Sequence, residues 1–320
     1  MKHILVTGGA GFLGSNLCKY LLEDPENYVY CLDNLVTGYK TNIEECRLNE
    51  RFHFTEYDIT SSNLLKDMNY VKLDEIYHLA CIASPPKYKQ YSIETLVTSF
   101  EGTKNMLELA RKTNAKLLFT STSEVYGDPL VHPQPEEYFG NVNTVGERSC
   151  YDEGKRVAET LIYEYRRLYG IDAKIVRLFN TYGPFMDLDD GRVITNFIKQ
   201  ILENKPLVIY GNGEQTRSFC YVDDTIEGMF KMMNSTEWGP INIGNPNTEF
   251  TLNILVEIFE KLTKQKLNVT YVGATENDPK QRKPVIDRGR TLLGWVPKVG
   301  IEEGLTKTCE YFTSRGKNNL

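Results

Sequence analysis

The sequence lacks the patterns by which metal sites and membrane spans are recognised. Only 4 of its 320 residues are histidine, and its 7 cysteines are scattered without any CxxC pair. Clustered cysteine and histidine supply the ligands of most structural metal sites, so we expect none here. No apolar run reaches the roughly 18 residues that a membrane-spanning helix needs, and we expect no signal peptide. The sequence therefore predicts a cytoplasmic protein without a membrane partner.

An excess of positive charge is also missing. The chain has 43 acidic and 37 basic side chains, a formal net charge of −6. Such a field does not recruit nucleic acid, so we expect no nucleic-acid partner. With 41% hydrophobic and 25% charged residues the composition is globular, and the length allows one large domain or two modest ones.

What is present begins with a strand, a glycine turn and a helix. An apolar run at residues 4–6 suits a buried parallel strand, and Gly8, Gly11 and Gly14 follow it with the spacing GxxGxxG. Glycines let the backbone approach a pyrophosphate closely, and the helix that starts there points its free N–H groups at the phosphates. Asp33 ends the next strand-like segment. Its carboxylate suits a ribose 2′-hydroxyl and repels a 2′-phosphate, which favours NAD over NADP; a purely structural glycine turn leaves it unexplained.

A second motif pairs a phenol with an ammonium group. Tyr151 and Lys155 lie four residues apart in a predicted helix and therefore share one face. The cation favours the phenolate and lowers the Tyr pKa, which makes a proton-transfer pair. This spacing is also common on ordinary amphipathic helices, so the pair indicates a catalytic site only together with the glycine motif.

The predicted cofactor-binding residues are Gly8, Gly11, Phe12, Leu13, Gly14, Asp33, Asn34, Asp58, Ile59, Ala80, Tyr151 and Lys155.

Strand-like and helix-like segments alternate along the first part of the chain, which predicts an α/β fold with a doubly wound parallel sheet. We predict a dinucleotide-binding domain at 1–180 and a smaller, interleaved substrate domain at 181–320, with part of 218–240 packing back on the first. We expect a hairpin or a strand–loop–strand at 206–224. The predicted strands are 3–8, 28–33, 51–58, 75–80, 116–122 and 173–180, and the predicted helices include 95–113 and 152–170.

Several blocks together resemble one enzyme family. They include ASPPKY at 83–88, STSEVYGDP at 121–129, RSCYDEGKRVAET at 148–160 and DPKQRKP at 278–284. The chain resembles the extended short-chain dehydrogenase/reductases that modify nucleotide sugars, and among them the UDP-glucuronic acid decarboxylases, or UDP-xylose synthases. Two departures lie near the inferred sugar pocket: Ile82 stands where that family usually has Pro, and Phe185 where it usually has Arg.

The resemblance implies NAD-dependent decarboxylation of UDP-glucuronate to UDP-xylose through a 4-keto intermediate, with NAD regenerated. It implies that Tyr151 is the base at the C4 hydroxyl, that Lys155 holds the nicotinamide ribose, and that Thr122 orients O4. Glu124 is placed for proton handling near C5, although an exposed loop carboxylate remains an alternative. A homodimer packed through helices 95–112 and 151–168 is also implied. The implied substrate-binding residues are Ser84, Ser123, Glu124, Asn180, Arg192, Arg217 and Arg282; without the motif context, either of the last two Arg could equally be a solvated surface charge.

Ser123 is the residue that distinguishes a decarboxylase from a related 4,6-dehydratase. Related 4,6-dehydratases carry an acid at this place, and a Ser hydroxyl is too weak an acid for that task. An Asp would also repel a substrate carboxylate, whereas Ser can donate a hydrogen bond to it. The triplet of Thr122, Ser123 and Glu124 therefore favours decarboxylation over dehydration. A 4-epimerase and, more remotely, a non-catalytic NAD-binding regulator stay open as alternatives.

Overall fold

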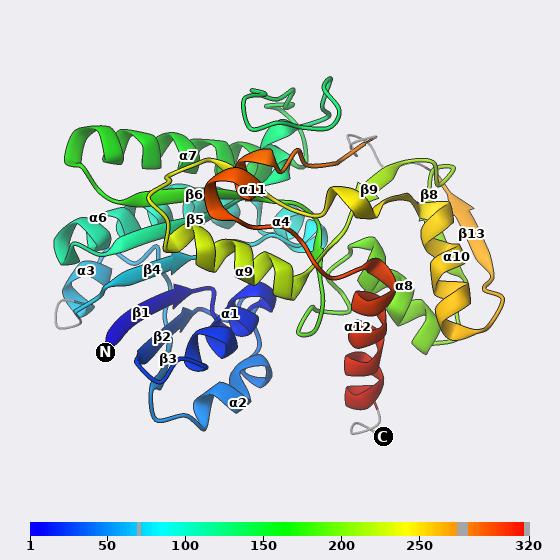
Figure 1. The fold of residues 1–320 in the computed structure, drawn as a ribbon, viewed down its shortest axis with the longest axis horizontal. Helices are drawn as coiled ribbons and strands as arrows, with labels where there is room; N and C mark the ends of the chain where they lie inside the picture. Colours follow the sequence, from blue (N-terminus) through cyan, green and yellow to red (C-terminus); the bar gives the residue numbers. More distant parts are fainter. Residues whose placement is uncertain (69–71, 274–280, 317–320) are drawn as a thin grey trace.

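A seven-stranded parallel sheet forms the centre of the larger part of the molecule (Figure 1). The computed structural model describes residues 1–68, 72–273 and 281–316. The strand order is β11-β6-β5-β4-β1-β2-β3, with every neighbouring pair parallel, so the expected doubly wound sheet is confirmed. The strands are β1 (Lys2–Thr7), β2 (Asn27–Asp33), β3 (Phe52–Glu56), β4 (Glu75–His78), β5 (Lys116–Thr122), β6 (Ala173–Leu178) and β11 (Ile241–Ile243).

Helices cover both faces of the sheet because its strands are apolar on both sides. Along β1, Ile4 and Val6 belong to one buried cluster and Leu5 to another, as the period of two in a strand requires. The first cluster includes residues of α1 (Phe12–Leu22) and α9 (Val222–Met233). The second includes residues of α6 (Thr103–Thr113) and α7 (Ser149–Tyr169).

The helix predicted at 95–113 is interrupted by a wider turn. The structure has α5 (Ser92–Val97), a π-helical turn (Thr98–Gly102) and then α6, so the helical path runs on but loosens in the middle. π-Helical turns are rare and occur frequently at functional sites. Here the turn and α5 both pack against α7, which carries Tyr151 and Lys155.

Most of the chain after residue 180 builds a smaller body beside the sheet, with α8 (Val193–Leu202), α10 (Leu252–Thr263) and α12 (Ile301–Gly316) (Figure 1). The hairpin alternative at 206–224 is wrong, because its three short strands pair with other partners. These pairs are β8 (Leu207–Tyr210) with β13 (Val269–Val272), β9 (Thr216–Ser218) with β12 (Glu249–Thr251), and β10 (Cys220–Tyr221) with β7 (Thr181–Tyr182).

Two elements from this later part of the chain lie on the sheet. β11 extends the sheet beyond β6, and α9 packs against α1, β5 and β6. The division of the chain at residue 180 stays a prediction. The remaining short helices are α2 (Glu44–Arg47), α3 (Leu64–Asp67), α4 (Pro85–Gln90) and α11 (Asp287–Leu293).

Candidate active site

A cleft of about 550 Å³ opens at the carboxyl ends of the strands. This is where ligands bind in doubly wound sheets, because the loops after neighbouring parallel strands converge there. All twelve predicted cofactor residues line it, from the glycine turn to Tyr151 and Lys155. Of the other predicted site residues, the cleft is also lined by Ser84, Thr122, Ser123, Glu124, Asn180 and Arg192.

The glycine turn leaves the start of α1 open to the cleft. Gly8 has a φ of +69°, and a side chain on Gly14 would overlap the Gly8 carbonyl oxygen. Asp33, at the end of β2, accepts hydrogen bonds from the backbone N–H groups of Ala10 and Leu35 at 3.0 and 2.8 Å. These bonds fix the carboxylate at the cleft wall, where a ribose hydroxyl would reach it.

Tyr151 lies in the first turns of α7 and is buried. Its ring stacks on that of Tyr88, with centroids 5.2 Å apart and planes 7° from parallel. Burial raises the Tyr151 pKa well above its ordinary value, and the nearby Cys81 thiol adds to this; Arg192 and a hydrogen bond with Thr122 act in the opposite direction. Arg192 and Thr122 thus favour the phenolate form of Tyr151.

The buried ammonium of Lys155 contacts the strand β5. Its Nζ donates to the Thr120 carbonyl oxygen at 2.7 Å and lies 4.6 Å from the centre of the Phe119 ring. Burial lowers the Lys155 pKa from its ordinary value. A lowering of the Tyr151 pKa by Lys155 stays a prediction, and both side chains line the same cleft.

Arg192 is held beside Tyr151 by a partly buried carboxylate, that of Asp190. Its guanidinium is 2.9 Å from Asp190 and donates to the Ala83 carbonyl oxygen at 2.9 Å. Ser84 donates to the Asp190 carbonyl oxygen at 3.0 Å, so the ASPP turn and the segment before α8 are tied together. The cleft thereby gains a fixed cation on the side of α4.

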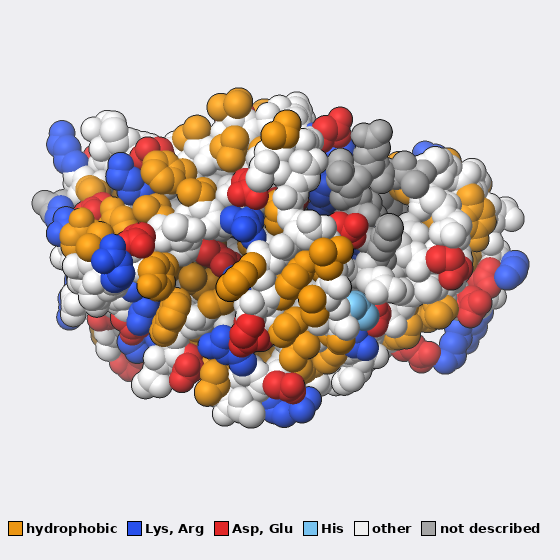
Figure 2. Space-filling view, turned by 90° about the horizontal axis from the view of Figure 1, so that it is seen from above, with side chains coloured by type: hydrophobic (Ala, Val, Ile, Leu, Met, Phe, Trp, Pro, Cys, Tyr) orange, Lys and Arg blue, Asp and Glu red, His pale blue; other side chains and the backbone are white. Residues whose placement is uncertain are grey.

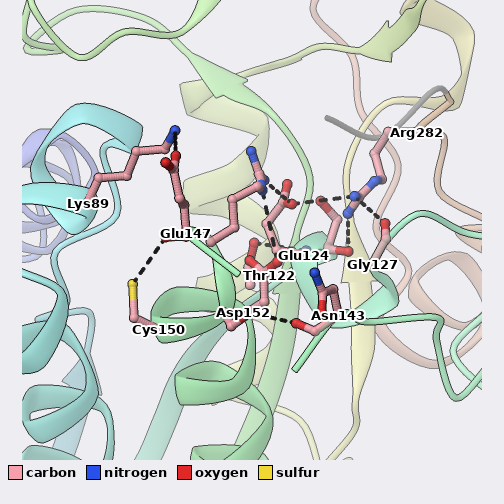
Figure 3. A network of polar contacts seen from close by, with 12 residues as sticks. Lys89, Thr122, Glu124, Gly127, Asn143, Glu147, Cys150, Asp152 and Arg282 are labelled. Carbon is pink, nitrogen blue, oxygen red and sulfur yellow. Dashed lines mark hydrogen bonds and ion pairs between the residues drawn. The ribbon is translucent and has the colours of Figure 1, made fainter. Parts of the chain in front are cut away.

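Glu124 forms ion pairs with two arginines, Arg148 and Arg282, and Figure 3 shows Glu124 beside Arg282. Its Oε2 is 2.5 Å from Arg148 and 3.4 Å from Arg282, and its backbone N–H donates to the Thr122 hydroxyl at 3.2 Å. Although burial alone would raise it, Arg282, Arg148 and Arg217 hold the Glu124 pKa at about 2. Glu124 is thus a carboxylate at neutral pH, and the exposed-loop alternative is not what the structure shows.

Arg282 and Arg217 do not line the cleft, unlike the other predicted substrate residues. Arg282 is buried and donates to the carbonyl oxygens of Ser123 and Gly127, the latter at 2.7 Å. Arg217 lies in β9 and donates to the Thr216 carbonyl oxygen. A contact of either with a diphosphate stays a prediction. Lys280, beside Arg282 in the DPKQRKP block, lies outside the described residues.

Sequence reasoning missed Arg148 and Tyr88. Both line the cleft, one on Glu124 and one on Tyr151. The signals were available, because Arg148 precedes Tyr151 by three residues in RSCYDEGKR, and Tyr88 ends ASPPKY. The two departures, Ile82 and Phe185, also line the cleft.

Residues 4–244 match the model of the NAD dependent epimerase/dehydratase family. The chain belongs to this family. UDP-glucuronic acid decarboxylase 6 of Arabidopsis thaliana is 51% identical over 313 residues, covering 98% of this chain and 89% of that protein. UDP-glucuronic acid decarboxylase 1 of Xenopus tropicalis is 47% identical over 311 residues, covering 97% and 72%.

Solved structures of the epimerase/dehydratase family share the fold. UDP-glucuronic acid 4-epimerase from Bacillus cereus, in complex with UDP-glucuronic acid and NAD, superposes with a TM-score of 0.89 at 31% identity. The match covers 98% of this chain and 99% of that one. The family's cofactor is NAD, and the residues present here fit it: a side chain at Gly11 would meet only the Gly8 oxygen at 3.2 Å, so the turn offers backbone to a pyrophosphate.

Two negative findings apply to the described part of the chain. Over residues 1–68, 72–273 and 281–316, no group of three or more His, Cys, Asp or Glu side chains is arranged to hold a metal ion. No helix within those ranges combines the length and apolar character needed to cross a bilayer.

Proposed function

We propose that this protein decarboxylates UDP-glucuronate to UDP-xylose. The observation that carries the proposal is Glu124, a carboxylate held between two arginines next to a neutral Ser123, in the cleft that also contains Tyr151. The identity to UDP-glucuronic acid decarboxylases over nearly the whole chain supports it.

Oxidation at C4 is what makes the loss of CO2 feasible. A 4-keto sugar with a carboxylate on C5 is a β-keto acid. The C5–C6 bond breaks, CO2 leaves, and the electron pair moves to O4 as an enolate. A proton then adds to C5, so one proton is consumed for each CO2 released. NAD, when bound, supplies reversible oxidation at C4, and the glycine turn, Asp33 and Lys155 would hold it.

The protein's own groups handle protons and charge. Tyr151 takes the proton of the C4 hydroxyl and later returns it to O4. Thr122, which hydrogen-bonds Tyr151, orients that oxygen. Glu124 lies on the loop after β5 and serves the protonation at C5, directly or through water. Arg192 supplies positive charge beside Tyr151, where negative charge develops on O4.

The test is to incubate the protein with UDP-glucuronate and NAD and to follow the sugar signals by NMR. A UDP-pentose with release of CO2 is expected, and Tyr151→Phe should abolish it. Conversion of UDP-glucuronate to UDP-galacturonate would support 4-epimerisation instead. That second candidate is favoured by the structural likeness to the Bacillus cereus epimerase, which binds the same nucleotide sugar. No change in UDP-glucuronate would contradict both.

We also propose a cytosolic homodimer. Helix α5 and the π-helical turn expose Ile93, Leu96, Val97 and Phe100, with 68%, 38%, 42% and 40% of their surfaces accessible. Hydrophobic side chains also gather, among charged ones, on the face seen from the side of α7 (Figure 2). A second copy packed on α5 and α7 would bury such side chains.

A further inference from the structure

Arg148 connects the two halves of the candidate site. It is the N-cap residue of α7, three positions before Tyr151, and it lines the cleft. Its Nη2 donates to Glu124 Oε2 at 2.5 Å, and its Nε lies 4.0 Å from Asp152 Oδ2. One guanidinium therefore joins the loop that carries Glu124 to the helix that carries Tyr151. Figure 3 shows Glu124, Asp152 and Arg282 around this network.

The second arginine on Glu124 has a different task. Arg282 is only 1% exposed, and it donates to the carbonyl oxygens of Ser123 and Gly127. It is thus bound to the backbone of the loop that carries Glu124. Arg148 instead comes from another element, is 20% exposed and faces the cleft. Of the two, Arg148 is the one that belongs to the helix of Tyr151, so it can fix where the Glu124 carboxylate lies relative to Tyr151.

Asp152 gives Arg148 its own support. It follows Tyr151 on α7 and is buried, and its Oδ1 has no hydrogen-bond partner among the described residues. Burial and the charge of Glu124 raise the Asp152 pKa to about 7, against the pull of Arg148 and Arg282. The ionised form of Asp152 is the one that pairs with Arg148, so near neutral pH it holds the guanidinium more weakly than Glu124 does.

We propose that Arg148 is a positioning residue that aims Glu124 at C5 of the sugar, with Asp152 holding the guanidinium in place. The proposal rests on the decarboxylase function above and deepens it. Charge-assisted hydrogen bonds are short and directional, so they can fix a carboxylate as well as neutralise it. In both ion pairs the contacting oxygen of Glu124 is Oε2.

The two chemical stages separate this role from a merely structural one. Oxidation at C4 depends on Tyr151, whereas protonation at C5 depends on Glu124. Arg148→Gln should therefore leave C4 oxidation within about threefold of the wild type but slow formation of the UDP-pentose by about 100-fold, the size expected for a misplaced reacting group. Reduced cofactor should accumulate, and stopped-flow absorbance of the reduced nicotinamide together with NMR of the products measures both stages.

Conservative variants sharpen the test. Arg148→Lys should recover part of the rate of pentose formation that Arg148→Gln loses. An ammonium can pair with Glu124, but it lacks the planar set of donors with which a guanidinium contacts Glu124 and Asp152 at once. Asp152→Asn should slow pentose formation by roughly tenfold or less, since Arg148 keeps its bond to Glu124. The matched control is Arg167→Gln, an exposed arginine on the same helix that pairs with Glu164. Its rates should equal those of the wild type, and the thermal midpoint of each variant shows whether it is folded.

Each outcome decides something. If the wild type forms no UDP-pentose, the decarboxylase function is overturned, and the role of Arg148 falls with it. If the wild type is active and Arg148→Gln matches Arg167→Gln, only the role of Arg148 is overturned. A folded Arg148→Gln protein in which C4 oxidation and pentose formation fall by the same factor also overturns it, because Arg148 would then serve the site as a whole.

Discussion

At the scale of single residues, the site is governed by charges placed where water is scarce. Glu124 stays ionised because Arg148 and Arg282 are within 2.5 and 3.4 Å of its Oε2. Ser123 beside it is buried and neutral. We propose that the substrate carboxylate meets a hydroxyl at this position, and the neighbouring Glu124 charge is already paired with arginines of the protein.

Changing Ser123 to an acid tests this directly. We expect Ser123→Asp to lower the rate of UDP-glucuronate decarboxylation by about 100-fold or more, because two carboxylates at close range repel by up to about 4 kcal/mol before screening. Ser123→Asn introduces a side chain of nearly the same size as Asp but without its charge, so this variant should retain most of the activity. Equal losses in the two variants would show that side-chain volume, not charge, decides at this position. Product formation by NMR is the measurement.

A second residue-scale prediction concerns His78, which lies buried under the cleft between the hydroxyls of Thr7 and Thr103. Burial and the charge of Lys155 lower its pKa to about 3. Between that pH and about 6.5 the unfolded chain binds a proton that the folded protein does not, so stability falls as the pH falls through this window. The slope from this group alone is at most roughly 1.4 kcal/mol for each pH unit.

The free energy of unfolding, measured by chemical denaturation at several pH values between about 4 and 7, gives this slope. We expect His78→Asn to have a clearly flatter dependence than the wild type. The same change at His53, which is exposed, should leave the slope unaltered. A wild-type slope in His78→Asn would mean that carboxylates, not this imidazole, are responsible.

At the scale of elements, α7 determines whether the catalytic pair meets the loop after β5. The helix packs closely on α5 and the π-helical turn, and Gly154 lies at this contact. A Cβ at Gly154 would come within 2.8 Å of the Ser99 hydroxyl and 3.1 Å of its Cβ. The absence of a side chain therefore sets the distance between the two elements.

We expect Gly154→Ala to destabilise the protein by about 1 kcal/mol, because an overpacking cost of about 1–3 kcal/mol exceeds the roughly 1 kcal/mol that Ala gains in a helix. Removing the obstructing side chain as well, in Gly154→Ala with Ser99→Gly, should recover part of the loss. Gly300→Ala, where the new Cβ has no neighbour within 4 Å, is the control. An unfolding midpoint of Gly154→Ala at or above that of the wild type would contradict the prediction.

A second contact between elements crosses the cleft. Tyr39, in the segment after β2, donates a hydrogen bond of 2.7 Å to Asp187, which precedes α8. This bond raises the Tyr39 pKa to about 12, and both side chains line the cleft. Residues beside the predicted ribose site are thus tied to the smaller body.

We expect Tyr39→Phe to release NAD up to about tenfold faster, because a hydrogen bond to a charged group contributes roughly 1.5 kcal/mol or less at an exposed position. The rate of NAD dissociation from the purified protein is the measurement. Tyr163→Phe, on the outer surface of α7, should not change it. Unaltered NAD release in Tyr39→Phe would show that the bond does not restrain the cofactor.

At the scale of the whole molecule, the fold of a single chain leaves apolar side chains of α5 and the π-helical turn exposed to solvent. Four apolar side chains there remain 38–68% exposed, which is the basis of the proposed homodimer. Light scattering of the purified protein should give twice the chain mass. Leu96→Glu combined with Phe100→Glu should give a single chain mass, whereas Ile254→Glu, at an exposed site on α10, should leave the dimer intact. A wild-type protein of single chain mass would overturn the homodimer.

The sequence determined those features that depend on neighbours within a few residues. The turn from β1 into α1 needs glycine at particular backbone positions. Short apolar runs predict the buried parallel strands. Tyr151 and Lys155 share a helix face by their spacing, and their cleft was predictable because loops after parallel strands converge. The continuous helix at 95–113 was predicted wrongly in its middle, since a π-helical turn leaves no clear mark on hydrophobic spacing.

The tertiary structure alone decided which charges meet. Glu124 pairs with Arg148 across 24 positions of sequence and with Arg282 across 158. Lys155 donates to the Thr120 carbonyl oxygen, 35 positions away, and Arg192 is a cation that lowers the Tyr151 pKa. No local spacing encodes such pairs, because the energy of a charge depends on its burial and on its distance to other charges, and both are set only when the sheet and its loops have packed.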